Sequence, residues 1–159
     1  MKWLVVFYSR TGTTKKVAEV LSDLLKCDME EILDTKNRMG FFGFLRAGMD
    51  AAFEKVTVIR KMEKNVAAYD GIIIGTPTWA SRMSPAVRTY ILQNKDGFRR
   101  TAFFCTCGGR GCRKVLTKMA DLSGQSPLAL LEVNHEEMAN ADYSSKVEKF
   151  VEELRKHEG

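Results

Sequence analysis

The first 24 residues contain the feature that most limits the fold of this chain, an apolar strand pattern that leads directly into a helical pattern. Residues 3–8 (Trp-Leu-Val-Val-Phe-Tyr) are all apolar or aromatic, which is typical of a strand buried on both faces of a parallel sheet. Four apolar residues then recur at helical spacing and form one stripe: Val17, Val20, Leu21 and Leu24. A buried strand followed at once by an amphipathic helix predicts an α/β fold.

The turn between this strand and helix is rich in hydroxyl groups. It consists of Ser9, Arg10, Thr11, Gly12, Thr13 and Thr14. Free backbone N–H groups at a helix start, the positive end of the helix dipole and these hydroxyls would together hold a phosphate. Gly12 lets the backbone curl close to the anion. Serine, threonine and glycine also occur as ordinary capping residues, but this turn has more hydroxyls than capping needs, so we predict a phosphate-binding loop.

Four more strand-like segments follow, separated mostly by helical patterns. They are residues 27–34, 70–75, 100–106 and 128–133. The first of them is the least apolar and is expected at the edge of the sheet. Helices are expected to begin at Ser84-Pro85 and at Cys112, and a last one to include residues 147–154. The sequence therefore predicts a single domain over residues 1–159, an α/β doubly wound five-stranded parallel sheet.

Two further loops at strand ends have unusual compositions. Residues 75–83 are predicted to form a loop with Trp79 at its tip, where the indole either stacks on a flat ligand or anchors the loop. The loop after the fourth strand is glycine-rich and brings main-chain N–H groups close to whatever lies above the sheet. For the strand order 2-1-3-4-5, ligands bind where the loops after strands one, three and four meet. Together the three loops predict a phosphorylated ligand with a flat ring.

These motifs resemble those of the flavodoxin-like flavoproteins, which bind flavin mononucleotide (FMN). The phosphate motif is matched by residues 9–14, and Thr76-Pro77-Thr78-Trp79-Ala80 resembles the second flavin loop. Cys107, Gly108, Gly109, Arg110 and Gly111 occupy the third loop. The resemblance implies that these three loops hold FMN, which performs the redox chemistry without a catalytic side chain.

The same resemblance implies a role in electron transfer, as a carrier or as a flavin-dependent reductase of a nicotinamide, a quinone or a protein partner. Many electron-carrier flavodoxins are acidic and cover the flavin with a tyrosine of the third loop. This chain has a formal net charge of +5 and glycines in that loop, so it resembles the reductases of the family more closely.

Two alternatives stay open at this point. Cys107 and Arg113 have the spacing of a thiol phosphatase, in which a thiolate at a helix start and an arginine hold a phosphate. Lys114 stands where that motif usually has a hydroxyl residue, and no general-acid aspartate is evident. A flavodoxin-like chain can also act as a non-catalytic interaction module, because fold does not imply function.

Residues 40–49 are rich in phenylalanine and glycine, and Phe41, Phe44, Leu45 and Gly48 are expected on one face of a short helix. These phenylalanines either cover the core or, if exposed, wall a ligand pocket or bind a partner.

Composition and charge limit which classes of partner, cellular location and metal site the sequence allows. Lysines and arginines are mixed with glutamates, which favours a solvated surface over a nucleic-acid interface. No segment approaches the ~20 apolar residues of a membrane span, and no signal peptide is evident, so we expect a cytoplasmic protein. Its four cysteines are then free thiols, and no metal site is expected because Cys27 lies on a distant strand. His135 and His157 are expected to be loop and tail residues.

Overall fold

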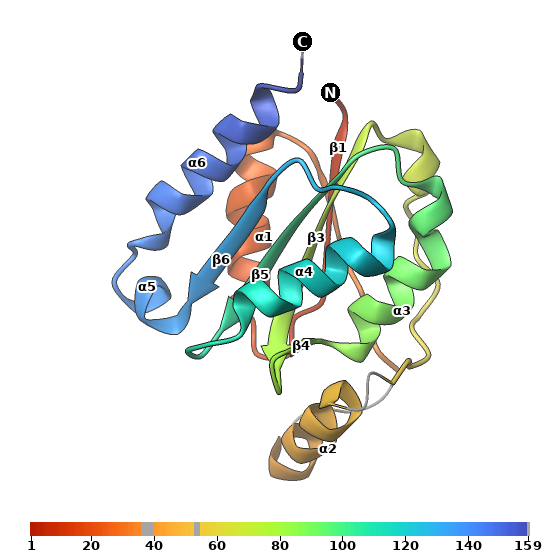
Figure 1. Cartoon of the computed structure of the whole chain (residues 1–159), viewed down its shortest axis with the longest axis vertical. Coiled ribbons are helices and arrows are strands. Elements are labelled where there is room, and N and C mark those ends of the chain that lie inside the picture. The colour runs from red at the N-terminus through yellow and green to blue at the C-terminus, as the bar shows by residue number, and fades with distance from the viewer. Residues whose placement is uncertain (36–39, 53–54, 159) are drawn as a thin grey trace.

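A parallel sheet with helices on both faces forms the body of the protein (Figure 1). The structure, a computed structural model, describes residues 1–35, 40–52 and 55–158. The main strands are β1 (Trp3–Phe7), β2 (Asp28–Glu31), β3 (Gly71–Trp79), β5 (Thr101–Cys107) and β6 (Leu130–Asn134). They lie in the order β2-β1-β3-β5-β6, and their neighbouring pairs are parallel. The predicted α/β fold and strand order are confirmed, with β2 at the expected edge.

Helices α1 (Thr13–Leu25) and α6 (Tyr143–Arg155) cover one face of the sheet, and α3 (Pro85–Asn94) and α4 (Cys112–Ser123) cover the other (Figure 1). Short 3-10 turns lie at Val66–Ala68 and Lys95–Gly97. Ser84 begins α3 as predicted, because its hydroxyl accepts a hydrogen bond from the Val87 N–H at 3.3 Å. Among the described residues, no helix is both long and apolar enough to cross a membrane.

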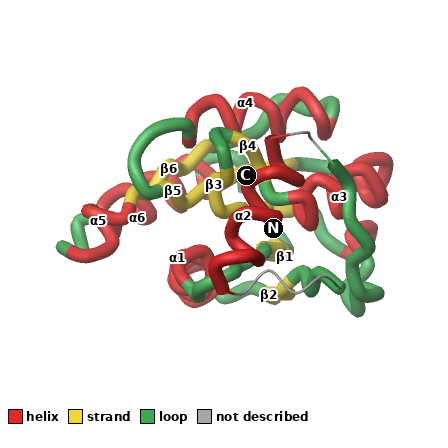
Figure 2. Tube along the Cα trace, turned by 90° about the horizontal axis from the view of Figure 1, so that it is seen from below, coloured by secondary structure: helices red, strands yellow, loops and turns green. Residues whose placement is uncertain are grey.

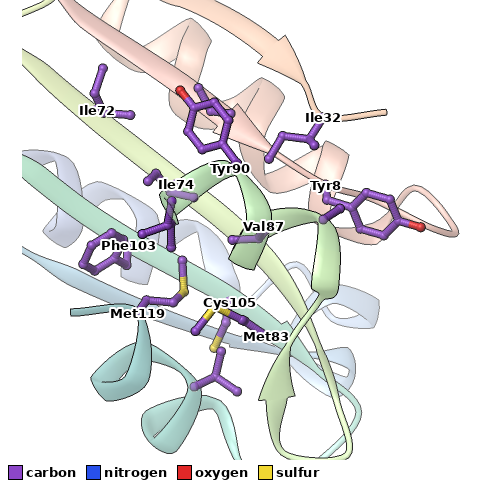
Figure 3. Packing of buried hydrophobic residues seen from close by; sticks show 14 of the residues in the cluster. Tyr8, Ile32, Ile72, Ile74, Met83, Val87, Tyr90, Phe103, Cys105 and Met119 are labelled. Atoms are coloured by element: carbon purple, nitrogen blue, oxygen red, sulfur yellow. The ribbon is translucent and has the colours of Figure 1, made fainter. Parts of the chain in front are cut away.

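The core consists of two apolar layers, one on each face of the sheet, because strand side chains alternate in direction. All five residues of β1 are buried. Leu4 and Val6 pack on the side of α3 and α4, whereas Val5 and Phe7 pack on the side of α1 and α6. Figure 3 shows part of the first layer, with Ile74 of β3 among its members.

A hairpin replaces the predicted loop at residues 75–83, and this part of the prediction was wrong. Strand β3 continues to Trp79, turns through Ala80 and Ser81, and returns as β4 (Arg82–Met83), which pairs with β3 in antiparallel fashion. Ala80 and Ser81 both have positive φ, 49° and 57°. Two successive positive φ angles are the backbone of a tight two-residue hairpin turn, usually formed by Asn and Gly.

His135 begins a helix, which corrects its assignment to a loop. This helix, α5 (His135–Ala139), follows β6 directly and has a capping box at its start. The Asn134 side chain accepts from the Glu137 N–H at 2.8 Å, and the Glu137 carboxylate accepts from the Asn134 N–H at 2.9 Å.

The expected helix in the phenylalanine-rich segment is α2 (Gly40–Ala52). It lies beyond the carboxyl ends of the strands (Figures 1 and 2) and contacts β3, β4 and α3. The side chains of Phe41 and Phe44 lie outside the described part of the chain. Phe42 is 84% exposed, so it does not cover the core.

Candidate functional site

Three loops at the carboxyl ends of β1, β3 and β5 are joined to one another, as the strand order predicts. The Tyr8 N–H donates to the Gly75 carbonyl at 3.2 Å, which ties the loop after β1 to β3. The hydroxyls of Thr14 and Thr106 lie 2.8 Å apart and connect the first loop to β5. A Cβ atom added at Gly111 would lie 2.9 Å from Ser81 Oγ, so the hairpin and the loop after β5 are in close contact. We call the segments at the ends of β1, β3 and β5 the first, second and third loops, and the second is the β3–β4 hairpin.

In the first loop, backbone N–H groups gather around the hydroxyl of Ser9. Gly12 adopts φ +93° directly before α1, and a Cβ atom at this residue would meet nothing within 4 Å. Ser9 Oγ accepts hydrogen bonds from the N–H groups of Gly12 at 3.0 Å and Lys15 at 3.3 Å. The first turn of α1 contains no acidic residue, so no carboxylate neutralises its positive end. These donors, with the accessible hydroxyls of Thr11 and Thr13, fit a phosphate group.

Thr14 differs from the other hydroxyl residues of this loop. Its side chain is buried, and its hydroxyl bonds the equally buried hydroxyl of Thr106. The Thr14 side chain therefore holds the first loop against β5, and only its backbone N–H is left to face a ligand.

The second loop carries Trp79, which is packed against another aromatic side chain. The rings of Trp79 and Tyr8 meet edge to face, with centroids 5.5 Å apart and planes at 89°. Both residues are less than one-tenth exposed. Of the two interpretations of Trp79, the structure shows the anchoring contact. Tyr8 was not predicted as part of this site, although its position directly after β1 was the available signal.

The base of the second loop is fixed by Thr76, whose hydroxyl accepts a hydrogen bond from the Ser84 N–H at 3.0 Å. Pro77 and Thr78 are half-buried, and Ala80 is exposed at the turn. The Thr78 hydroxyl lies 3.9 Å from the Cys112 sulfur, a second link to the third loop.

The third loop offers backbone groups with little side-chain cover. Gly108, Gly109 and Arg110 are exposed, and a Cβ atom at Gly109 would meet nothing within 4 Å. Gly111 adopts φ +107° directly before α4. Cys107, by contrast, is buried at the end of β5.

The thiol phosphatase alternative is not supported by this geometry. Burial raises the pKa of Cys107 to about 12, whereas a nucleophilic cysteine needs a lowered pKa. The guanidinium of Arg113 is largely exposed and pairs with Glu132 at 3.3 Å. The arginine and the thiol therefore do not form a common phosphate clamp.

The cysteines are unpaired, as expected. All four cysteines are free thiols. Within residues 1–35, 40–52 and 55–158, no group of three or more His, Cys, Asp or Glu side chains could hold a metal ion.

Comparisons with known proteins agree with the predicted resemblance. A family model described as NADPH-dependent FMN reductase matches residues 1–116. No curated protein sequence matches the chain significantly.

Solved structures share the fold. A flavoprotein in complex with FMN from Lactobacillus acidophilus NCFM is 21% identical, with a TM-score of 0.74 over 87% of this chain and 97% of that chain. Oxidised flavodoxin 1 from Bacillus cereus is 20% identical, with a TM-score of 0.57 over 99% of both chains. A putative flavoprotein from Bacteroides eggerthii is 21% identical, with a TM-score of 0.65 over 91% of this chain and 97% of that chain.

Proposed function

The chain belongs to the NADPH-dependent FMN reductase family, and we propose that it holds FMN in the three loops and receives electrons from a reduced nicotinamide dinucleotide. Family membership confirms FMN as the predicted ligand and electron transfer as the predicted role. The residues that bind FMN and the identity of the electron donor are our proposal.

One observation carries the assignment of the phosphate site, the backbone around Gly12. The N–H groups of Gly12 and Lys15 donate to the neutral hydroxyl of Ser9. A Cβ atom at Gly12 would meet nothing within 4 Å, and the first turn of α1 contains no acidic residue. A phosphate oxygen is a stronger acceptor for the same donors, because a hydrogen bond to a charged group is shorter and stronger than a neutral one. We assign the phosphate to the backbone of residues 10–14 and to the hydroxyls of Ser9, Thr11 and Thr13.

The second and third loops would hold the ring of the flavin. Backbone groups of residues 77–80 and of Cys107, Gly108, Gly109 and Gly111 lie at the same edge of the sheet as the phosphate site. Trp79 is held by its contact with Tyr8 and gives the second loop a fixed aromatic wall. When bound, FMN supplies the electron transfer, while the protein orients it.

The bare third loop favours a reductase over a carrier that exchanges electrons only with proteins. The exposed glycines at residues 108 and 109 have no side chains of their own that could cover a ring bound beside them. An uncovered ring face gives a nicotinamide room to approach. The direct expectation is that the FMN-loaded protein oxidises NADPH in the presence of an electron acceptor.

FMN binding is tested by adding FMN to the purified protein, removing the excess and recording the visible spectrum. The Thr11→Ala/Thr13→Ala double variant should bind FMN more weakly, because each lost hydrogen bond to a charged group costs roughly 1.5–3 kcal/mol. Each such loss weakens the affinity about tenfold or more. Thr117→Ala is the matched control, since Thr117 lies on the exposed face of α4 and bonds only the Arg113 carbonyl. Equal affinities of the double variant and the wild type would reject this phosphate site.

A further inference from the structure

Three cysteine thiols meet at the start of α4, and the proposed function uses none of them. Cys112 is the first residue of α4 and is buried. Its thiol donates a hydrogen bond to the carbonyl oxygen of Cys105 at 3.7 Å, and its sulfur lies 3.9 Å from the hydroxyl oxygen of Thr78. The Cys107 thiol donates to the Gly109 carbonyl at 3.6 Å, and Cys105 and Cys107 are both close enough to Cys112 to influence its ionisation.

The surroundings of Cys112 favour a thiolate. Cys112 occupies the first turn of a helix that has no acidic residue there, and the positive end of a helix stabilises a thiolate. The proximity of Cys105 above all, and of Cys107 and Thr78, lowers the pKa of Cys112 to about 7, against the opposing effects of burial and of Glu132.

Its two neighbours are thiols at neutral pH. Burial raises the pKa of Cys107 to about 12 and raises the pKa of Cys105 further still. The cluster therefore combines one nucleophilic sulfur with two protonated ones.

Cys107 is held less tightly than Cys105. Cys105 lies within β5 and is fixed between Thr76 of β3 and Glu132 of β6. Cys107 is the last residue of β5 and pairs with Asn134 of β6 on one side, and glycines make up most of the loop that joins it to Cys112. This loop is exposed and open at Gly109, which suits a small oxidant better than a protein disulfide.

We propose that Cys112 and Cys107 form a redox-active dithiol that a hydroperoxide oxidises to an intramolecular disulfide. The Cys112 thiolate attacks one oxygen of the hydroperoxide, the O–O bond breaks, and the leaving oxygen takes a proton from water. Cys112 is then a sulfenic acid. The Cys107 sulfur attacks the Cys112 sulfur, the S–O bond breaks, and the departing hydroxide takes the Cys107 proton to form water. The two thiols lose two electrons and two protons, and the hydroperoxide is reduced.

The test treats the full-length protein with hydrogen peroxide, blocks the remaining thiols by alkylation and maps tryptic peptides by mass spectrometry. Trypsin cuts after Arg110 and Arg113, so the Cys112 tripeptide separates from peptide 101–110. The two peptides should become linked, and the number of free thiols should fall from four to two. The Cys105→Ser variant should keep the link, which identifies Cys107 as the second sulfur. Cys27→Ser is the matched control at a remote cysteine and should also keep it.

The rate of linkage should rise with pH around 7, as the Cys112 thiolate forms. Cys112→Ser and Cys107→Ser should each abolish the link. The proposal is overturned if the wild-type digest shows Cys112 unmodified, or oxidised to a sulfinic acid without a link. A link that persists in Cys107→Ser or disappears in Cys105→Ser would overturn the choice of Cys107. The wild-type digest decides the main question even if a serine variant fails to fold.

Discussion

The first and third loops have the same backbone turn and opposite chemistry. Each follows a buried parallel strand and ends in a glycine with positive φ, Gly12 at +93° and Gly111 at +107°, with ψ of −8° and −9°. In each, the glycine carbonyl accepts the first helical hydrogen bond at 3.1 Å, from Lys16 and from Val115 respectively. The first residue of the helix is Thr13 in one loop and Cys112 in the other.

The difference between the loops shows that one helix start can serve two kinds of anion. In the first loop, hydroxyls and the N–H groups that donate to Ser9 lie beside an open space at Gly12, which fits a phosphate from a ligand. In the third loop, the protein places its own ionisable sulfur at the equivalent position. In our two proposals, the same kind of positive helix end would bind the FMN phosphate at one strand end and stabilise a thiolate at another.

The largest difference in stability is expected between alanine variants of Gly12 and Gly111, because only Gly111 has close neighbours around the added Cβ atom. Gly12→Ala should cost about 1–2 kcal/mol of unfolding free energy, the price of a Cβ atom at positive φ. Gly111→Ala should cost about 2–5 kcal/mol, because its Cβ atom would also lie 3.2 Å from the Ser81 Cα. Urea unfolding of both variants measures the difference. Equal losses of stability would mean that the β3–β4 hairpin shifts enough to accommodate the Cβ atom at residue 111.

A smaller loss of stability is expected at the hydrogen bond between Thr14 and Thr106, which joins the first loop to β5. Thr106→Val leaves the Thr14 hydroxyl buried without its partner, at a cost of about 1–3 kcal/mol. The Thr14→Val/Thr106→Val double variant should cost less than the sum of the single variants, because the second change removes the unpaired hydroxyl. Thermal or urea unfolding of the four proteins gives the coupling. Strictly additive losses would show that the contact contributes no coupling between the loops.

The comparison is sharpened by placing a cysteine at the matching position of the first loop. In a Cys112→Ser background, Thr13→Cys should have a thiol pKa below the usual value of about 8.5, because it occupies the same helix start. Its pKa should stay above the value of about 7 at Cys112, which also has thiol neighbours. Alkylation rates at the individual cysteines, measured against pH in this variant and in the wild type, give the two values. A pKa at or above the usual value would show that the helix start is not the shared cause.

The smallest effect is expected at a charge outside both loops. The Tyr69 hydroxyl donates to the Asp28 carboxylate at 2.6 Å, at the start of β2, and this bond holds the pKa of Asp28 below its usual value of 3.8. A lowered carboxyl pKa stabilises the fold above the unfolded pKa, and this stability is lost as the pH falls through the lowered value. Tyr69→Phe should therefore reduce the loss of stability below about pH 4 and leave FMN binding unchanged. Unfolding curves at pH 3 to 7 test this, and an unaltered acid profile would contradict it.

Most of the sheet could be predicted from the sequence because its strands are buried on both faces. Runs such as Ile72-Ile73-Ile74 have no polar residue to offer to solvent, so their burial does not depend on register. The β3–β4 hairpin escaped prediction because its turn uses Ala80 and Ser81, neither of which favours positive φ. Helix α5 was missed although its capping box, Asn134 with Glu137, was readable in the sequence.

The sequence predicted that the three loops lie together, but not how their side chains point. Hydroxyl content drew attention to the first loop, but it did not distinguish Thr14, whose direction depends on contact with Thr106. In the third loop, the phosphatase spacing drew attention to Cys107. The acidity of Cys112 depends on groups from β3 and β5 that only the folded chain brings together.

The two ends of the segment that carries α2 are joined by hydrogen bonds between residues 33–35 and 58–60. Asp34 and Ile59 form an antiparallel bridge, flanked by hydrogen bonds from the Thr35 N–H to the Val58 carbonyl at 3.1 Å and from the Arg60 N–H to the Leu33 carbonyl at 2.8 Å. These bonds hold the start and the end of this segment next to each other. Joining the ends in this way keeps the loop-closure cost of a longer or shorter segment small, whereas Ala47 of α2, which is buried in the core, ties the middle of the segment to the body of the protein.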